Sequence, residues 1–556
     1  MIPAGTLREF ALVQTNQTFQ SPVVMGEVEP QDLHSMEQTD MIIIAPKAFT
    51  AQAERLAQEH RERDGLSVAV VDPVRIYNEF SSGTPDATAY RRFMKMFYDR
   101  KTSDKDAPKY LLLFGDGIYD NRGLYLKNIS RDNMLLTYES ENSLDISSYV
   151  TDDYFGLLDD SEGVNIARDG LDIGIGRFPV RTVTEAKQVV DKLIRYMDNS
   201  LKGAWKNKMA FVADDGSASD RPSYDTIHVY QSNYEADYIE KNHPEFMVEK
   251  VFFDAYKKDY SGSTTYPDVK TKIQRLLKEG LLLINYTGHG NTQSWSDEKV
   301  LTQTDIMQAS YECLPLWVTA TCDFTRFDDA NTSAGEDVLL NKTSGGVALF
   351  TTTRAVYPGP NFRINKELLR NLFEKKDGRR LTLGEVMKIT KRNLGYDANK
   401  LNFILIGDPA MKLAYPEYRM KVTAVNGTKV GNDPIYLKAL QRVTVEGEVL
   451  NSEGSLAADF TGLLNPTVMD SRDVVTTLDN NRTGMNFQYT TYNNRLFAGT
   501  DSVRAGKFKF SFTVPKDISY SNDFGKLNLY AADDTIGNEA QGSFLNFIVG
   551  GTDEQA

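Results

Sequence analysis

An apolar run leads directly into a histidine at Leu281-Leu-Leu-Ile-Asn-Tyr-Thr-Gly-His-Gly290, and a second leads into a cysteine at Leu314-Pro-Leu-Trp-Val-Thr-Ala-Thr-Cys-Asp323. Continuous apolar runs of this length are typical of buried strands in a parallel sheet. In open α/β sheets, functional groups collect at the carboxyl ends of such strands. His289 and Cys322 are 33 residues apart, about the length of one strand–helix–strand unit. Adjacent strands would place them side by side, which predicts a Cys–His dyad.

A purely structural role for either residue stays open at this point. A loop histidine between two glycines can simply bond a carbonyl group, and a buried cysteine is usually a small inert apolar residue, which is our interpretation of Cys313. A Cys313–Cys322 disulfide is disfavoured, because the pair would bracket a strand more than about 20 Å long while a disulfide needs Cα atoms about 6 Å apart. With two cysteines and five histidines, the chain offers too few ligands for a zinc site of the usual kind.

The same alternation of apolar strands and amphipathic helices extends in both directions from these motifs. Among others, it predicts strands at Met209–Asp214 and Leu316–Ala320 and helices at Val183–Met197 and Tyr224–Lys241. It predicts a mostly parallel, doubly wound α/β sheet covered on both faces. We expect an irregular segment over 1–40, an α/β subdomain over 41–200 and a catalytic α/β subdomain over 201–416. After Pro416 the helical pattern stops, and alternating stretches such as Phe508–Val514 predict an all-β sandwich over 417–550, followed by a tail over 551–556.

Composition excludes several function classes. The net charge is −14 and the chain has no long basic run, so nucleic-acid binding is not expected. No apolar stretch reaches the roughly 18 residues that a transmembrane helix requires. The start, Met1-Ile-Pro-Ala-Gly5, has no signal-peptide pattern, which would normally indicate the cytosol, but the irregular first 40 residues look more like the interior of a longer protein. We therefore expect a fragment.

Three aspartates at further strand ends are additional site candidates. Asp116 follows Tyr110–Phe114, and Asp152 and Asp153 precede a second turn. They are candidates for orienting the histidine, lining a substrate pocket or binding a structural calcium ion. The alternative is ordinary turn formation, in which an aspartate bonds its own backbone. No metal is assigned to the catalytic site, and no cofactor is required.

The two motifs, in this order and at this spacing, resemble those of the gingipain-type cysteine peptidases. Ile175–Arg181 and Ile404–Pro409 are also similar to the family, and the resemblance covers about 40–416 with the β-domain behind it. It implies a caspase-like fold in two subdomains followed by an immunoglobulin-like sandwich. It also implies that Cys322 is the nucleophile, that His289 is its acid–base partner, and that the amides of Gly290 and Cys322 form the oxyanion hole.

Asp32–Met36, Ile76–Gly83 and Thr321–Asp328 resemble the surface sortases of this family. That likeness implies a cell-surface protein at the outer membrane that removes the C-terminal signal domain from type IX secretion cargo through a thioester. It further implies transfer of the new carboxyl end to anionic lipopolysaccharide, and contact with other subunits of the attachment complex. Two alternatives remain: a non-catalytic caspase-like adaptor, and an ordinary secreted gingipain-like endopeptidase.

Overall fold

A computed structural model describes residues 11–16, 18–19, 21–24, 26–143, 145–216 and 226–553. The first ten residues, residues 224–225 of the helix predicted over 224–241, and the last three residues of the tail lie outside the described ones. In the described part of the chain, no helix has the length and apolar character needed to cross a membrane.

One ten-stranded sheet organises the catalytic part of the chain. Its strands follow the order β2-β1-β3-β4-β14-β11-β10-β7-β5-β6. Their bounds are β1 (Met41–Ile44), β2 (Val68–Val71), β3 (Tyr110–Phe114), β4 (Gly174–Phe178), β5 (Lys208–Ala213), β6 (Met247–Phe252), β7 (Leu283–Thr287), β10 (Leu316–Ala320), β11 (Ala348–Thr352) and β14 (Phe403–Ile406). The central strands are buried along their whole length, as expected for a sheet covered on both faces.

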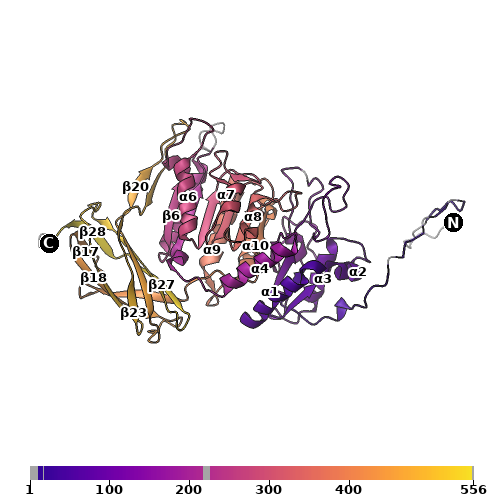
Figure 1. Cartoon of the computed structure of the whole chain (residues 1–556), viewed down its shortest axis with the longest axis horizontal. Helices are drawn as coiled ribbons and strands as arrows, with labels where there is room; N and C mark the ends of the chain where they lie inside the picture. Colours follow the sequence, from indigo (N-terminus) through magenta and orange to yellow (C-terminus); the bar gives the residue numbers. More distant parts are fainter. Residues whose placement is uncertain are drawn as a thin grey trace.

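Two rows of helices pack on this sheet (Figure 1). α1, α4, α8 and α7 contact one another in one row, and α10, α9 and α5 in another. The helices are α1 (Thr50–Arg63), α2 (Pro73–Phe80), α3 (Thr88–Arg100), α4 (Val183–Met197), α5 (Ile227–Asn242), α6 (Pro267–Glu279), α7 (Gln303–Gln308), α8 (Ala334–Leu340), α9 (Pro358–Phe373) and α10 (Leu383–Leu394). The predicted α/β class is confirmed.

The sheet has an internal seam. Strands β1 to β4 come from the first expected subdomain and the other six from the second, and they meet where β4 pairs with β14 through one residue pair, Ile406 with Arg177. β14 is antiparallel to β11, whereas the other strand pairs of the sheet are parallel. The predicted two-part α/β fold therefore takes the form of two blocks joined edge to edge, while its exact boundaries stay a prediction.

The C-terminal part is all β, as predicted. A large sheet in the order β16-β15-β18-β24-β23-β19-β26-β27 is closed by an additional β15–β27 pairing, and a small sheet of β17, β28 and β25 packs with it. The strands are β15 (Tyr418–Val425), β16 (Thr428–Lys429), β17 (Ile435–Ala439), β18 (Arg442–Leu450), β19 (Gly462–Met469), β20 (Asp473–Thr476), β21 (Gln488–Thr491), β22 (Arg495–Ala498), β23 (Asp501–Arg504), β24 (Lys507–Thr513), β25 (Asp523–Phe524), β26 (Lys526–Ala532), β27 (Glu539–Phe544) and β28 (Phe547–Thr552). β20 and β21 form a separate hairpin.

Candidate active site

The register of two neighbouring strands brings His289 and Cys322 to the same edge. β7 and β10 are parallel and adjacent, and their last residues, Thr287 and Ala320, lie opposite each other. His289 and Cys322 each stand two residues beyond that pair. Because neighbouring strands are about 4.8 Å apart, the two backbones leave the sheet side by side. The structure thus brings together the two residues of the predicted dyad.

The two loops that carry these residues touch through a glycine. A Cβ atom added at Gly290 would lie 2.5 Å from Oγ1 of Thr321, the residue before Cys322. A Cβ atom at Gly288 would lie 2.4 Å from the Cβ of Asp214. Neither glycine adopts a left-handed φ. The glycines flanking His289 are therefore needed for close approach of neighbouring chains rather than for a special backbone conformation.

Three hydrogen bonds fix the backbone of His289. Its amide donates to Asp214 Oδ2 at 3.0 Å, and its carbonyl accepts from the Tyr286 hydroxyl at 2.6 Å and from the Ser296 amide at 2.9 Å. The Tyr286 ring is stacked on Trp295, with 4.2 Å between the ring centroids and 6° between the planes. The histidine loop is thus supported by a buried aromatic wall rather than left as an open turn.

Cys322 occupies a tight turn after β10. Its thiol donates to the carbonyl oxygen of Val356 across 3.7 Å, and burial raises the pKa of that thiol, to which the charge of Asp323 adds. Asp323 has a φ of 29°, unusual for a residue with a side chain, and its amide donates to the carbonyl of Arg354 at 3.1 Å. The cysteine is therefore presented on a strained, well-anchored turn, with the protonated thiol favoured at rest.

The other predicted residues lie in structural ion pairs. Asp116, Asp152 and Asp153 are all buried, and each carboxylate has its own cationic partner. The pairs are Asp116–Arg181, Asp152–Arg177 at 2.9 and 2.7 Å, and Asp153–Lys391 at 2.7 Å. Burial raises the pKa of Asp116 to about 7. Since each carboxylate already neutralises a Lys or Arg side chain, these aspartates do not fit a calcium site, and no contact with His289 is seen among the described residues.

Acidic residues that we did not predict lie behind His289. Asp214, Asp215 and Glu298 are close enough to share an ion. The Lys258 ammonium group takes the place of such an ion, at 2.8 Å from Asp215 and 2.9 Å from Glu298. The Tyr266 hydroxyl also donates to Asp215, at 2.6 Å. The cluster therefore has a built-in cation, and its carboxylates are used within the protein.

A second histidine also faces the site. The His228 ring lies 5.2 Å from that of His289, edge to face. Burial and the neighbouring His289 lower the pKa of His228 to about 3, so this imidazole stays neutral near pH 7. Its Nδ1 atom is buried and has no hydrogen-bond partner among the described residues. From the sequence, His228 was one of five histidines with nothing to single it out.

The two cysteines lie in different surroundings. Both are free thiols, so the disfavoured disulfide is absent. Cys313 packs behind Gly280, where an added Cβ atom would lie 2.9 Å from the Cβ of Cys313, and burial raises the pKa of its thiol. The interpretation of Cys313 as a packing residue agrees with this position.

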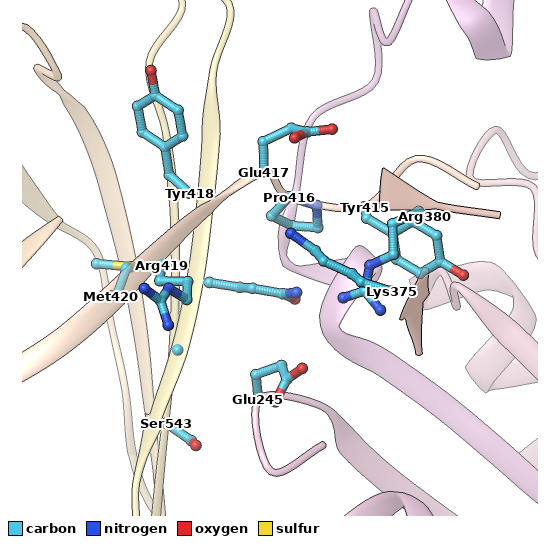
Figure 2. A pocket seen from close by; sticks show the side chains of 12 residues that line it. Glu245, Lys375, Arg380, Tyr415, Pro416, Glu417, Tyr418, Arg419, Met420 and Ser543 are labelled. Carbon is cyan, nitrogen blue, oxygen red and sulfur yellow. The ribbon is translucent and has the colours of Figure 1, made fainter. Parts of the chain in front are cut away.

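A hollow of about 200 Å³ lies elsewhere, at the junction of the catalytic and β-domains (Figure 2). Tyr415 and Arg380 line it from the catalytic side and Arg419 from β15, and the Arg380 guanidinium group sits 4.6 Å from the centre of the Tyr415 ring. None of the predicted site residues lines this hollow. The hollow therefore belongs to the junction between the catalytic domain and the β-domain.

Comparisons with known proteins agree with the predicted fold. PorU from Porphyromonas gingivalis, crystallised as a latent dimer, is 31% identical over 96% of this chain and 45% of its own length, with a TM-score of 0.46. This chain thus spans less than half of that relative. The Arg-specific cysteine proteinase gingipain R is 17% identical, covers 94% of this chain and 100% of its own, and has a TM-score of 0.52, which shows a shared fold.

No curated protein sequence matches the chain significantly. The family model of peptidase family C25 matches residues 34–414, well over half of the chain. That span contains the whole ten-stranded sheet and both motif loops. The chain belongs to peptidase family C25, which confirms the expected likeness to the gingipain-type cysteine peptidases.

Proposed function

We propose that Cys322 and His289 form the catalytic dyad of this peptidase. The observation that carries the proposal is the β7–β10 register, which brings the two loops out of the sheet together. The thiol of Cys322 gives its proton to His289, and the sulfur then bonds to the scissile carbonyl carbon. The C–N bond breaks as the imidazolium returns the proton to the leaving amine, which leaves a thioester.

Two backbone amides support an oxyanion hole at this edge. Among the described residues, neither the Gly290 amide nor the Cys322 amide donates a hydrogen bond within the protein. Donors held free in this way are suited to the negative charge that develops on the carbonyl oxygen, and one such donor is worth about 3–4 kcal/mol of transition-state stabilisation. No cofactor takes part in these steps.

We further propose a sortase role. The 31% identity to PorU over nearly the whole chain supports activity at the outer-membrane surface on cargo proteins that end in a C-terminal signal domain. In this role, an amine of anionic lipopolysaccharide resolves the thioester in place of water. Other subunits of the attachment complex are the expected partners.

The test uses the full-length protein in secreting cells. Cys322→Ala and His289→Ala should each abolish release of the cargo signal domain, while Cys313→Ala, the matched thiol control, should leave it intact. Mass spectrometry of mature cargo should find the lipid-linked carboxyl end only where Cys322 is present. Normal signal-domain release in either dyad variant would refute the dyad.

Other results would point to the remaining alternatives. Cleavage of arbitrary peptides that carry no signal domain, without a conjugated product, would indicate an ordinary endopeptidase. Equal inertness of Cys322 and Cys313 towards iodoacetamide, with cargo still bound, would indicate an adaptor. Selective labelling of Cys322 near neutral pH is expected instead.

A further inference from the structure

A hairpin of the β-domain reaches over to the catalytic sheet. Figure 1 shows β20 leaving the β-domain and lying beside β6. β20 and β21 pair with each other and with no other described strand, and an isolated two-stranded hairpin is at best marginally stable. Packing supplies the missing support: the Tyr489 ring of β21 lies 4.7 Å from Phe252, in an apolar cluster with Ala213 and Val229.

The tip of this hairpin is hydrogen-bonded to the residue after Phe253. The carboxylate of Asp254 accepts from the amides of Asp479 and Asn480 at 2.9 and 2.8 Å. The Asn480 side chain adds a bond to the same carboxylate at 2.9 Å, and the Leu478 amide donates to the Asp254 carbonyl at 2.7 Å. Asp254 is buried, so breaking these bonds would leave its charge poorly solvated.

The next tip residue, Asn481, enters the acidic cluster behind His289. Its Nδ2 donates to Asp215 at 3.2 Å, and its Oδ1 accepts from Lys258 at 3.0 Å. The Asp215 amide donates to Asp214 Oδ1 at 2.9 Å, and Asp214 Oδ2 accepts the His289 amide at 3.0 Å. A continuous, partly buried series of contacts thus joins the β-domain to the histidine.

Charge and burial around these contacts make the position of His289 sensitive to the loss of any one of them. Burial, together with the neighbouring Asp215 and Glu298, raises the pKa of Asp214 well above its usual value. Lys258 is the cation paired with the cluster, and its side chain is 5% exposed. Among the described residues, the groups next to His289 include His228 from α5, Asp214 after β5 and the Cys322 turn, while Asp215 and Glu298 lie beside Asp214. In such a poorly hydrated site each charge–dipole contact is stronger than it would be in water.

We propose that the β20–β21 hairpin is a positioning element of the active site, in which Asn481 and Lys258 hold Asp215 and Asp214 so that Asp214 fixes His289. None of these residues contacts the reacting atoms, so they are positioning residues rather than catalytic ones. This rests on the proposed function, because the hairpin has this task only if His289 serves Cys322. The β-domain then helps to position the active site instead of only following the catalytic domain in sequence.

The experiment compares three variants of the full-length protein. Asn481→Ala removes the contact to Lys258 and Asp215, Asp254→Ala releases the hairpin tip, and Val474→Ala is the matched control, because its side chain on β20 is 67% exposed. The rate of iodoacetamide alkylation at Cys322 is measured from pH 5 to 9, and hydrogen exchange is followed at the amides of 287–292. Melting temperatures report global stability.

We expect Asn481→Ala and Asp254→Ala to slow alkylation of Cys322 at pH 7 about tenfold and to move its pH profile, the size of effect that one hydrogen bond to a charged group gives. Exchange at His289 should accelerate, while Val474→Ala behaves as wild type. Wild-type alkylation and exchange in both tip variants would overturn the proposal. Failure of the dyad itself would look different: Cys322 would then be no more reactive than Cys313 in the unmodified protein, while the exchange data would still report on the hairpin.

Discussion

Gly290→Ala tests directly whether the spacing of the two motif loops sets catalysis. The new Cβ atom would lie 2.5 Å from Thr321 Oγ1 and 3.2 Å from the Ser294 carbonyl. An unstrained contact needs about 3.5 Å, so the loops carrying His289 and Cys322 must move apart by about 1 Å. Overpacking of this kind costs about 1–3 kcal/mol of unfolding free energy, and a 1 Å misplacement of reacting groups costs about 100-fold in rate. The Gly290 amide is kept, so the loss reports spacing rather than a missing donor.

A second substitution separates this explanation from general damage. Thr321 Oγ1 is buried without a hydrogen-bond partner among the described residues, so Thr321→Ala removes the clash and abandons no polar contact. We expect Gly290→Ala/Thr321→Ala to recover most of the lost kcat/KM for signal-domain cleavage and most of the melting temperature. Gly262→Ala is the control, because an added Cβ atom there meets nothing within 4 Å. A Gly290→Ala protein with the wild-type rate, or a double variant no better than the single one, would refute the reasoning.

Three further substitutions test buried charge. The pKa of His228 is lowered to about 3, so its contribution to stability is complete above pH 6.5 and is lost as pH falls. At pH 5 the loss in unfolding free energy amounts to about 2 kcal/mol. His228→Phe should therefore flatten the acidic part of a plot of melting temperature against pH. Burial lowers the pKa of His60, but the neighbouring Asp408 has the larger opposite effect and brings that pKa up to about 10. His60 therefore stabilises the fold below pH 6.5, and this stabilisation is lost as pH rises towards 10. The melting temperature of His60→Gln should fall less steeply with rising pH than that of the wild type, and an unchanged slope would contradict the assignment. Asp328→Asn leaves Arg354, bonded to Asp328 at 2.8 Å, as an unpaired buried charge and should cost about 3–5 kcal/mol by thermal denaturation, whereas a loss below about 1 kcal/mol would show that water reaches the pair.

Local pattern was enough to predict the strands that carry the site, but not how they are ordered. Leu316–Ala320 and Val183–Met197 form with the expected bounds because an apolar run and an amphipathic period are local signals. β14, at Phe403–Ile406, was not predicted, since four apolar residues look alike in a helix or a strand and in either strand direction. The strands of the β20–β21 hairpin have four residues each and no distinctive pattern, so nothing local showed that the hairpin leaves the β-domain.

The acidic residue behind His289 shows the same limit more sharply. Asp214 is the last residue of the strand that we expected over 209–214 and directly follows β5, so it carried nearly the same signal that singled out Cys322. Only the pairing of β5 with β7, Ala213 beside Thr287, identifies its carboxylate as the one next to His289. Asp116 carried that signal as well, but lies at the end of β3 in the other block of the sheet. Strand-end chemistry is thus readable from sequence, whereas strand order is set by packing between distant segments.

The protonated resting thiol and the acidic cluster are linked through the position of His289. Burial favours the neutral Cys322 thiol, so forming a thiolate requires that the imidazolium of His289 be stabilised in return. The acidic cluster of Asp214, Asp215 and Glu298 reaches His289 through its backbone amide, which donates to Asp214, and Lys258 is the cation paired with the cluster. Because Asn481 contacts Lys258 and Asp215 from the β-domain, a chain cut after residue 416 would keep both strand ends and lose this support of the cluster. If the proposed positioning role holds, the reactivity of Cys322 depends on both domains, and its measurement requires a chain that keeps both.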